Sequence, residues 1–277
     1  MLVNDDNLMV MRKMKSGIID LVYTDPPFMS ERDYGEFDDR WSSETHKPIN
    51  EPRTMIKYFQ AVKEIHSDSM YNYLCFMYPR LMEIHRLLKP TGSMYLHCDP
   101  SASHYLKTLL DGLFGAQNFR NEVVWAYTGA ANVKKHFPRK HDIILFYAKS
   151  DAFQFNRDAV RIPYAKGLSV GGGTSWAGEK KNVDDYVNRG KVVEDWWIDV
   201  TTVSRKHPEK TGYPTQKPIK LLERIIAAST NVGDVVLDPF CGCATACVAA
   251  ERLGRKWIGI DINKKAIDIG YERLHNV

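Results

Sequence analysis

The stretch Lys217–Leu274, KPIKLLERIIAASTNVGDVVLDPFCGCATACVAAERLGRKWIGIDINKKAIDIGYERL, decides the fold. Apolar residues first recur at helical spacing, and a short β-branched run then leads to Asp238. A second helical stretch, a second apolar run ending at Asp261 and a last helical stretch follow. Such alternation through short connections is typical of a parallel sheet with crossover helices, which makes the fold class α/β. We expect strands at 234–237 and 257–260, and helices at 217–229, 244–253 and 264–274.

Upstream of this stretch the pattern is less regular. The first element we expect is a buried strand at 18–23, followed by a polar, irregular stretch from 29 to about 53. Residues 151–213 contain Gly171–Gly173 and show no sustained helical period. We therefore predict one domain made of residues 1–150 and 214–277, with 151–213 as an insert or small subdomain. Further strands are expected at 93–98, 122–127 and 142–149, and further helices at 71–88 and 105–113.

The composition is that of an ordinary globular protein. The 277 residues are 44% hydrophobic and 26% charged, which excludes collagen-like, mucin-like and wholly disordered chains. No window approaches the ~18 apolar residues of a membrane span, and the N-terminus lacks a secretory signal, so we predict a cytoplasmic protein. A net charge of +4 permits nucleic-acid binding without requiring it.

Three of the five cysteines lie close together, at Cys241, Cys243 and Cys247. A zinc site would normally show paired ligands at C-x2-C spacing, and that spacing is missing here. We therefore predict small buried thiols and no metal.

Acidic residues end the two C-terminal strands. Asp238 is followed by a turn containing Gly242, and Asp261 comes about twenty residues later, the spacing of an acid that binds a ribose diol. The G-x-G-x-x-G pattern of a dinucleotide site is absent, so the turn favours a nucleoside without pyrophosphate, with S-adenosylmethionine as the candidate. Taken alone, the pattern is equally typical of an ordinary βαβ turn with helix-capping acids.

The loop after strand 18–23 reads Thr24-Asp25-Pro26-Pro27-Phe28. The lone pair of an adenine amino group is delocalised into the ring, so the nitrogen is a poor nucleophile. Two acceptors for its N–H groups, the Asp25 carboxylate and the Pro26 carbonyl held rigid by proline, would localise that lone pair. Phe28 would stack on a base taken out of the duplex. The alternative is a tight Pro-Pro turn with a buried phenylalanine.

Together these motifs resemble the β class of amino-methylating DNA methyltransferases, in which the catalytic motif precedes the cofactor motif. Asp25–Phe28 is similar to the family's D-P-P-[YF] motif, and Asp238–Gly242 to D-P-F-x-G. Pro214–Pro218 resembles T-Q-K-P, and Asp5–Leu8 resembles G-D-N-L. Two departures stand out: Ala244 replaces a common second glycine, and Asp5 replaces the usual glycine before Asp6.

The resemblance implies a Rossmann-like S-adenosylmethionine-dependent methyltransferase fold, with a mainly parallel sheet and helices on both faces. It further implies direct methyl transfer from S-adenosylmethionine to the adenine amino group after base flipping, with no covalent enzyme intermediate. The catalytic residues it implies are Asp25, Pro26, Pro27 and Phe28. The cofactor-binding residues it implies are Asp6, Asn7, Asp25, Thr215, Lys217, Asp238, Phe240, Gly242 and Asp261.

The resemblance implies double-stranded DNA as the partner and residues 151–213 as a target-recognition insert. It also makes a homodimer and a cognate restriction endonuclease possible partners. Basic pairs suited to phosphate contacts occur at 134–135, 139–140, 180–181 and 205–207, although solvated surface lysines are as common an explanation. For Trp196-Trp197 we favour packing over base stacking. The loop 29–53, with Arg32, Tyr34, Arg40 and Trp41, is a candidate to close over the flipped base or to help wedge the duplex apart.

Three other functions stay open on the sequence. The first is the same chemistry on cytosine, giving 4-methylcytosine, although Asp25 rather than a serine at the head of the motif favours adenine. The second is a non-catalytic DNA-binding relative. The third is methylation of RNA or of protein amides, where similar motifs occur.

Overall fold

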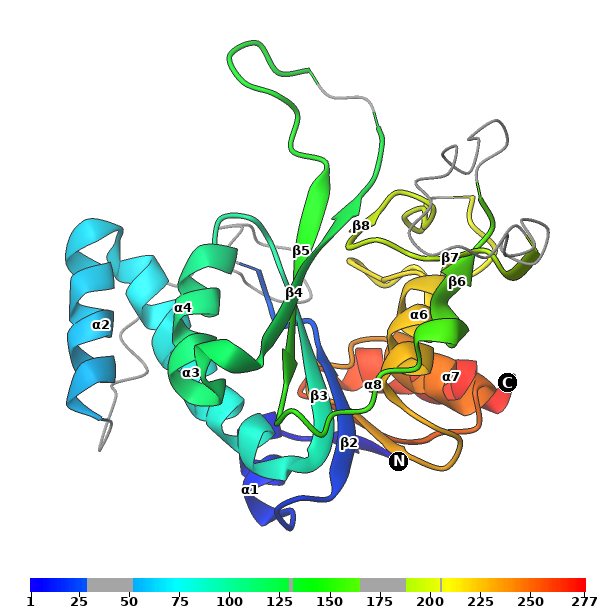
Figure 1. The fold of residues 1–277 in the computed structure, drawn as a ribbon, viewed down its shortest axis with the longest axis horizontal. Helices are drawn as coiled ribbons and strands as arrows, with labels where there is room; N and C mark the ends of the chain where they lie inside the picture. Colours follow the sequence, from blue (N-terminus) through cyan, green and yellow to red (C-terminus); the bar gives the residue numbers. More distant parts are fainter. Residues whose placement is uncertain (29–51, 130–131, 165–187, 205) are drawn as a thin grey trace, which may run out of the picture.

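The computed structural model describes residues 1–28, 52–129, 132–164, 188–204 and 206–277. At its centre is an eight-stranded sheet in the order β1-β10-β9-β2-β3-β5-β4-β8 (Figure 1). The first five strands in this order are parallel, β5 is antiparallel to both its neighbours, and β8 pairs parallel with β4. The predicted mainly parallel α/β fold is confirmed. The strands are β1 (Leu2–Asn4), β2 (Ile19–Thr24), β3 (Leu88–Cys98), β4 (Phe119–Ala126), β5 (His141–Ala148), β8 (Trp196–Trp197), β9 (Val235–Asp238) and β10 (Lys256–Asp261).

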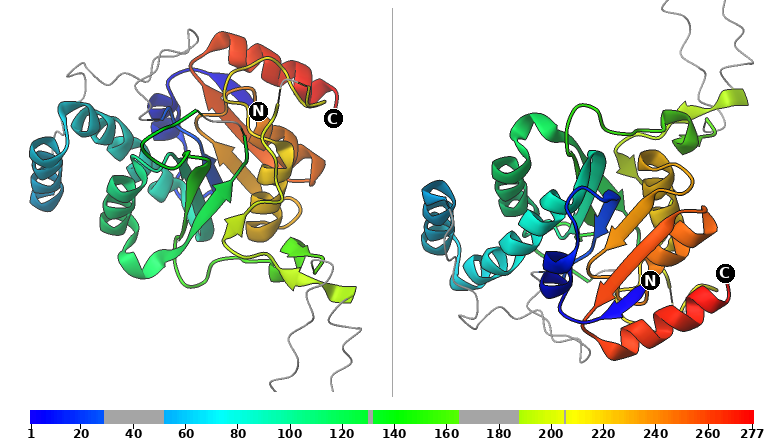
Figure 2. Two further views of the ribbon diagram at one scale, coloured as in Figure 1. Left: turned by 90° about the horizontal axis from the view of Figure 1, so that it is seen from above. Right: turned by 90° about the horizontal axis from the view of Figure 1, so that it is seen from below.

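Helices cover both faces of the sheet (Figure 2). One face carries α1 (Asn7–Lys13), α3 (Asp68–Leu87) and α4 (Ser103–Phe114), and α2 (Arg53–Ile65) packs on α3. The other face carries α6 (Ile219–Ser229) and α7 (Thr245–Arg252), with α8 (Lys264–His275) beside α7. Smaller elements are the 3-10 helices η1 (Ala116–Asn118) and η2 (Arg157–Val160) and the two-stranded sheet of β6 (Arg161–Ile162) and β7 (Lys191–Val192).

The burial of the central strand β2 explains why apolar residues occupy its successive positions 21–23. All six of its residues are buried. Val22 packs in the core beneath α3 and α4, whereas Leu21 and Tyr23 pack in the core beneath α6 and α7. A strand covered on both faces needs apolar side chains at successive positions rather than at alternate ones. Burial on both faces also fixes the direction in which the following loop, 25–28, leaves the sheet.

The N-terminal part of the chain differs from the sequence prediction. The strand at 18–23 is not the first element, because β1 and α1 precede it. β1 has only three residues and forms by pairing with β10, more than 250 residues away, so its own sequence carries little signal. Helix α2, also not predicted, buries only Phe59 and Val62. Most of the 29–53 loop, Gly171–Gly173 and the pair at 180–181 lie outside the described residues.

Parts of the predicted insert pack directly on the main domain. Strand β8 extends the sheet beside β4, and the side chain of Asn156 donates hydrogen bonds to the carbonyls of Ala227 and Thr230 at the end of α6. The prediction that Trp196 and Trp197 pack holds for Trp197, which is 6% exposed, but Trp196 is 51% exposed. Within the described residues, no helix is both long enough and apolar enough to cross a bilayer.

Candidate functional site

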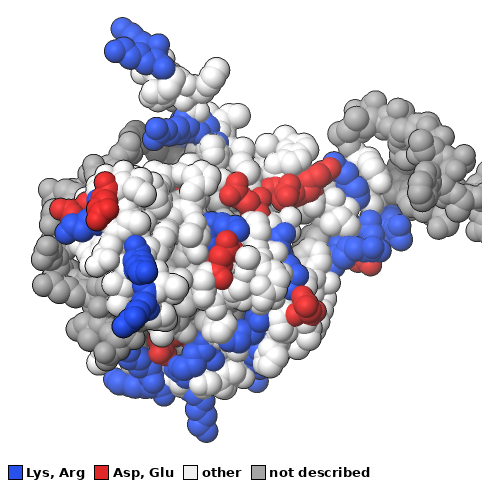
Figure 3. Space-filling model, turned by 60° about the vertical axis from the view of Figure 1, so that its left-hand side comes forward, with Lys and Arg blue, Asp and Glu red and all other residues white. Residues whose placement is uncertain are grey.

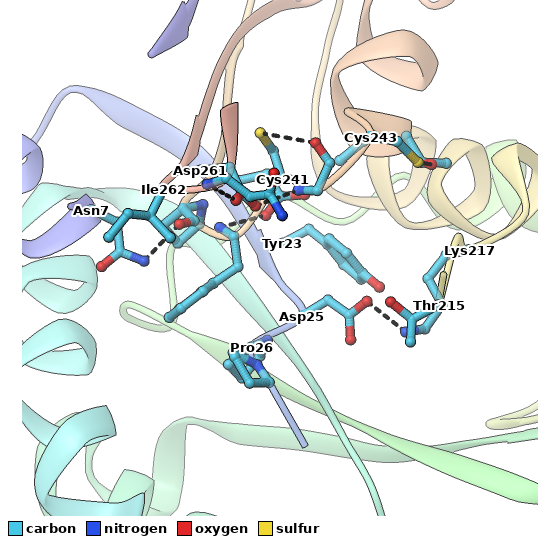
Figure 4. A pocket seen from close by; sticks show the side chains of 18 of the residues that line it. Asn7, Tyr23, Asp25, Pro26, Thr215, Lys217, Cys241, Cys243, Asp261 and Ile262 are labelled. Carbon is cyan, nitrogen blue, oxygen red and sulfur yellow. Dashed lines mark hydrogen bonds and ion pairs between the residues drawn. The ribbon is translucent and has the colours of Figure 1, made fainter. Parts of the chain in front are cut away.

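Three strand-end acids meet at one edge of the sheet. Strands β10, β9 and β2 are adjacent and parallel, so their carboxyl ends bring Asp261, Asp238 and Asp25 together. The three side chains line a cavity of about 240 Å³ (Figure 4). Ligands of open α/β sheets bind at this edge. Every residue expected from the sequence to bind a cofactor or to act in catalysis lines this cavity: Asp6, Asn7, Asp25, Pro26, Pro27, Phe28, Thr215, Lys217, Asp238, Phe240, Gly242 and Asp261.

The glycine turn and the acid of the next strand are directly linked. The Gly242 N–H donates to Asp261 Oδ2 and the Asn263 N–H to Asp261 Oδ1, both at 2.8 Å. Gly242 has φ +49°, and a Cβ there would lie 3.3 Å from the Tyr213 ring. Ala244, in place of the family's second glycine, also adopts a left-handed conformation, with φ 61°. An L-residue pays ~1–2 kcal/mol for this, so the substitution is accommodated with backbone strain rather than by a different turn.

The acids of the cavity are held in an environment that disfavours their charged forms. Burial raises the pKa of Asp238 well above its usual range, and the nearby carboxylates of Asp25 and Asp261 raise it further. Burial likewise raises the pKa of Asp261. Like charges in a low-dielectric site repel, and a cationic group placed among them relieves that repulsion. The cavity is therefore suited to a ligand that carries positive charge.

Asp6 and Asn7 reach the cavity from the turn between β1 and α1. Asp6 caps α1 by accepting the Met9 N–H, and Asn7 donates to the Pro239 carbonyl at 2.7 Å. Arg80 of α3 holds both residues, donating to Asn7 Oδ1 at 2.8 Å and to Asp6 Oδ2 at 3.0 Å. Burial lowers the pKa of Arg80 to about 10. Arg80 was not among the predicted site residues, although an arginine on the apolar face of a predicted helix is a usable signal.

Lys217 is placed against the catalytic motif. Its Nζ lies 2.5 Å from Asp25 Oδ2 and 4.9 Å from the centre of the Phe28 ring. The two charged side chains are only 10% and 17% exposed. Lys217 can reach Asp25 because α6 begins only at Ile219, after Pro218, so the lysine lies outside the helix. The structure thus brings Lys217 to the carboxylate itself, beyond the cofactor contact that the family resemblance implied.

A second cavity, of about 820 Å³, opens on the other side of Phe28. Arg139, at the turn between β4 and β5, is among its lining residues, as are Trp125 and Tyr127. The two cavities share Phe28, Tyr213, Thr215, Gln216 and Lys217. Phe28 therefore belongs to the walls of both cavities, while Asp25 lines the first one alone.

A buried chain of hydrogen bonds joins the walls of these cavities. Tyr23 Oη lies 2.8 Å from His97 Nδ1, and His97 Nε2 lies 3.1 Å from Asp142 Oδ2. Tyr127 donates to Asp142 Oδ1 at 3.0 Å. Burial alone would raise the pKa of Asp142, but the bonds and charges of His97 and its neighbours lower it overall. His97 also packs 5.8 Å from Phe28, ring centre to ring centre, so it supports the Phe28 ring. None of the residues in this series of hydrogen bonds was predicted from the sequence to belong to the site.

The clustered cysteines behave as small apolar residues. Cys241, Cys243 and Cys247 are buried free thiols, and burial raises the pKa of Cys241 and of Cys247. A Cβ at Gly259 would lie 2.7 Å from the Cys247 sulfur and 3.1 Å from that of Cys241. These thiols therefore fill the space between α7 and β10. Among the described residues no group of His, Cys, Asp and Glu is arranged to hold a metal ion.

Fold and site together define a Rossmann-like α/β protein with a nucleoside-type pocket at the carboxyl edge of its sheet and a second cavity beside it. Residues 19–272 match the N6_N4_Mtase family model, described as DNA methylase, and the chain belongs to this family. The family resemblance seen in the sequence is thereby confirmed.

Two relatives and two solved structures illustrate the likeness. The chain is 31% identical to Type II methyltransferase M.HpaI of Haemophilus parainfluenzae, over 99% of this chain and 73% of that protein. It is 28% identical to DNA adenine methyltransferase YhdJ of Escherichia coli K12, over 99% and 82%. The PvuII DNA methyltransferase (cytosine-N4-specific) superposes with a TM-score of 0.63 at 16% identity, over 100% and 93%. A Thermus thermophilus DNA modification methylase complexed with S-adenosyl-L-methionine gives 0.60 at 18%, over 99% and 93%.

Proposed function

We propose that this chain is a site-specific DNA methyltransferase that transfers a methyl group from S-adenosylmethionine to the exocyclic amino group of adenine. The observation that carries the proposal is that Asp25–Phe28 lines the first cavity and that Phe28 and Lys217, the partner of Asp25, also line the second. One cavity would hold the methyl donor and the other a base turned out of the duplex. The two reactants would meet at the loop between them, within reach of the Asp25 carboxylate.

The acid-walled cavity fits S-adenosylmethionine by its charge and by its shape. The buried Asp238 carboxylate suits the cationic part of this ligand, and Asp261 keeps acceptor lone pairs for a ribose diol. Gly242 leaves open the side of the turn that a Cβ would occupy. Asp6, Asn7, Thr215 and Phe240 would complete the contacts. When bound, the cofactor supplies an electrophilic methyl group.

The chain's own contribution is placement and hydrogen bonding. Lys217 binds Asp25 Oδ2, which orients the carboxylate and leaves Oδ1 for one N–H of the target amino group. The Pro26 carbonyl would accept the other N–H, and Phe28, supported by His97, would stack on the base. Holding two reactants in line contributes up to about 7–11 kcal/mol to lowering a barrier. No covalent attachment of the base to the protein is required.

The comparisons support the substrate class and the choice of base. One relative is named a DNA adenine methyltransferase, and two are named Type II methyltransferases. A structural neighbour is cytosine-N4-specific, so 4-methylcytosine is the alternative product. Asp25 at the head of the motif favours adenine. A homodimer, a restriction endonuclease partner and a cytoplasmic location stay predictions.

For the domains, we propose residues 1–150 and 214–277 as the catalytic methyltransferase domain and 151–213 as the target-recognition part. Thr202, Val203 and Lys210 from the second range line the cavity proposed for the base. These three residues support a role of this range in forming the wall of the base cavity. Which residues read the sequence of the DNA depends on their side chains meeting base edges.

The test uses DNA from a host that expresses the chain. Single-molecule sequencing would give the modified base and its sequence context, and mass spectrometry of digested DNA would separate 6-methyladenine from 4-methylcytosine. Asp25→Ala should abolish transfer of a labelled methyl group while S-adenosylmethionine still binds by calorimetry. Glu64→Ala, on the surface of α2, is the matched control and should retain both. Near-normal activity of Asp25→Ala would refute the catalytic assignment.

A further inference from the structure

The turn between β4 and β5 projects from the body of the protein (Figure 1). The two strands are antiparallel with Ala126 opposite His141, and the Tyr127 N–H donates to the Lys140 carbonyl at 2.9 Å. Beyond this bond, residues 132–139 are all exposed. Phe137 is 93% exposed, more than any other large hydrophobic residue in the described part of the chain. We call the described residues 127–129 and 132–141 the hairpin.

The hairpin is strongly basic. It contains Lys134, Lys135, Arg139 and Lys140 and no acidic residue, so it carries four positive charges, as many as the formal net charge of +4 of the whole chain. Figure 3 shows basic side chains at the projecting tip. The next acid along the chain, Asp142, already accepts bonds from Tyr127 and His97. Within the described part of the chain none of these four side chains forms an ion pair, so the hairpin presents a basic surface with an aromatic ring in its middle.

The base of the hairpin forms a wall of the second cavity. Tyr127, Arg139 and His141 line that cavity together with Phe28 of the catalytic motif. Phe137 is two residues from Arg139, so their Cα atoms lie no more than ~7.6 Å apart. Successive bases of one strand are ~3.4 Å apart along the duplex axis. The same turn thus carries the exposed phenyl ring and a residue of the wall of the cavity proposed to receive the flipped base.

We infer that the hairpin opens the duplex: Phe137 inserts into the base stack beside the target while Lys134, Lys135, Arg139 and Lys140 contact the flanking phosphates. This inference rests on the proposed function and deepens it. An exposed aromatic ring in a basic turn suits duplex DNA, because phosphates match the charge and stacked bases match the ring. The ring would take up part of the stacking that the flipped base gives up.

The decisive comparison uses two substrates, both containing the target sequence found by sequencing. One is a fully paired duplex, and the other has a mismatch opposite the target base, where flipping costs least. Phe137→Ala should lower kcat/KM at least tenfold on the paired duplex and less than threefold on the mismatched one. Phe137→Trp should stay within threefold of wild type on both. Ile65→Ala, which removes an apolar side chain 79% exposed at the end of α2 and outside every proposed site, is the control and should match wild type.

Two further measurements separate the insertion of Phe137 into the base stack from the phosphate contacts of the basic side chains. With 2-aminopurine at the target position, saturating Phe137→Ala should give a smaller fluorescence rise than wild type. Removing both Lys134 and Lys135 should leave that rise intact and reduce the salt dependence of binding by roughly two phosphate contacts. Equal losses of Phe137→Ala on both substrates, or none on the paired duplex, would overturn the inference alone. Absence of methylation by the wild-type chain would overturn the proposed function and the inference with it.

Discussion

Asp238→Asn should change stability and cofactor binding in opposite directions. Asp238 is 3% exposed, and its carboxylate Oδ1 accepts the Phe240 N–H at 3.1 Å. Its pKa in the folded protein is raised by burial and by Asp25 and Asp261. An asparagine keeps the acceptor for Phe240 and removes the charge. The protein without cofactor should therefore gain about 1–4 kcal/mol at neutral pH, the range found when costly buried charges are replaced.

The sign of the pH dependence follows from the raised pKa. The stability contributed by such a carboxyl is fully present below its unfolded pKa of 3.8 and is lost as the pH rises through the folded pKa. The advantage of Asp238→Asn over wild type should therefore grow with pH above about 4, by at most ~1.4 kcal/mol per unit. Urea unfolding at a series of pH values measures this difference directly.

Cofactor binding should fall in the same variant. A hydrogen bond to a charged group contributes about 1.5–3 kcal/mol, so losing the carboxylate charge should raise the S-adenosylmethionine Kd roughly 10- to 150-fold by calorimetry. Asp20→Asn is the matched control, because Asp20 is also buried but lies 2.8 Å from Lys89. That variant should lose stability and keep cofactor affinity. An Asp238→Asn protein that is less stable and binds normally would refute the reasoning.

Three other substitutions test the remaining contacts. Lys217→Met should lower kcat about 100-fold with little change in S-adenosylmethionine affinity, because Asp25 loses the group that orients it. Gly242→Ala should cost about 1–2 kcal/mol in unfolding free energy and weaken cofactor binding, since φ is +49° and a Cβ would lie 3.3 Å from Tyr213. Arg80→Met should cost about 1.5–3 kcal/mol and weaken cofactor binding about tenfold, because the turn at the start of α1 loses its support.

Each of these outcomes has a clear opposite. A Lys217→Met protein with normal kcat and weak cofactor binding would show that the lysine binds the cofactor and does not orient Asp25. A Gly242→Ala protein with unchanged stability and Kd would show that the turn does not need its left-handed residue. Normal S-adenosylmethionine affinity of Arg80→Met would show that the β1–α1 turn does not contribute to cofactor binding. Single-turnover methyl transfer, urea unfolding and calorimetry measure the three quantities.

The elements predicted correctly have long, regular patterns of their own. The strands ending at Asp238 and Asp261 and the helix between them are predictable because burial on one or both faces of an element determines the spacing of its apolar residues. β1 could not be predicted from the sequence, because its three residues form a strand only by pairing with β10. Pairing between distant segments leaves no periodic mark in either one.

The sequence by itself determined the α/β class, the two motifs and the family, because strand-end acids, the Pro-Pro loop and the glycine turn are local features with fixed spacing. Only the tertiary structure decided which of their atoms meet. It placed Lys217 on Asp25 across 192 residues of chain, joined Arg80 to Asn7, and built the second cavity from β4, β5 and residues near 202–217. Parallel strands bring their carboxyl ends, and with them Asp25, Asp238 and Asp261, to one edge whatever their distance in the chain, and α3, the segment before α6 and the antiparallel β5 complete the site there. Because the contacting residues lie far apart in the sequence, no local sequence pattern predicts that they meet.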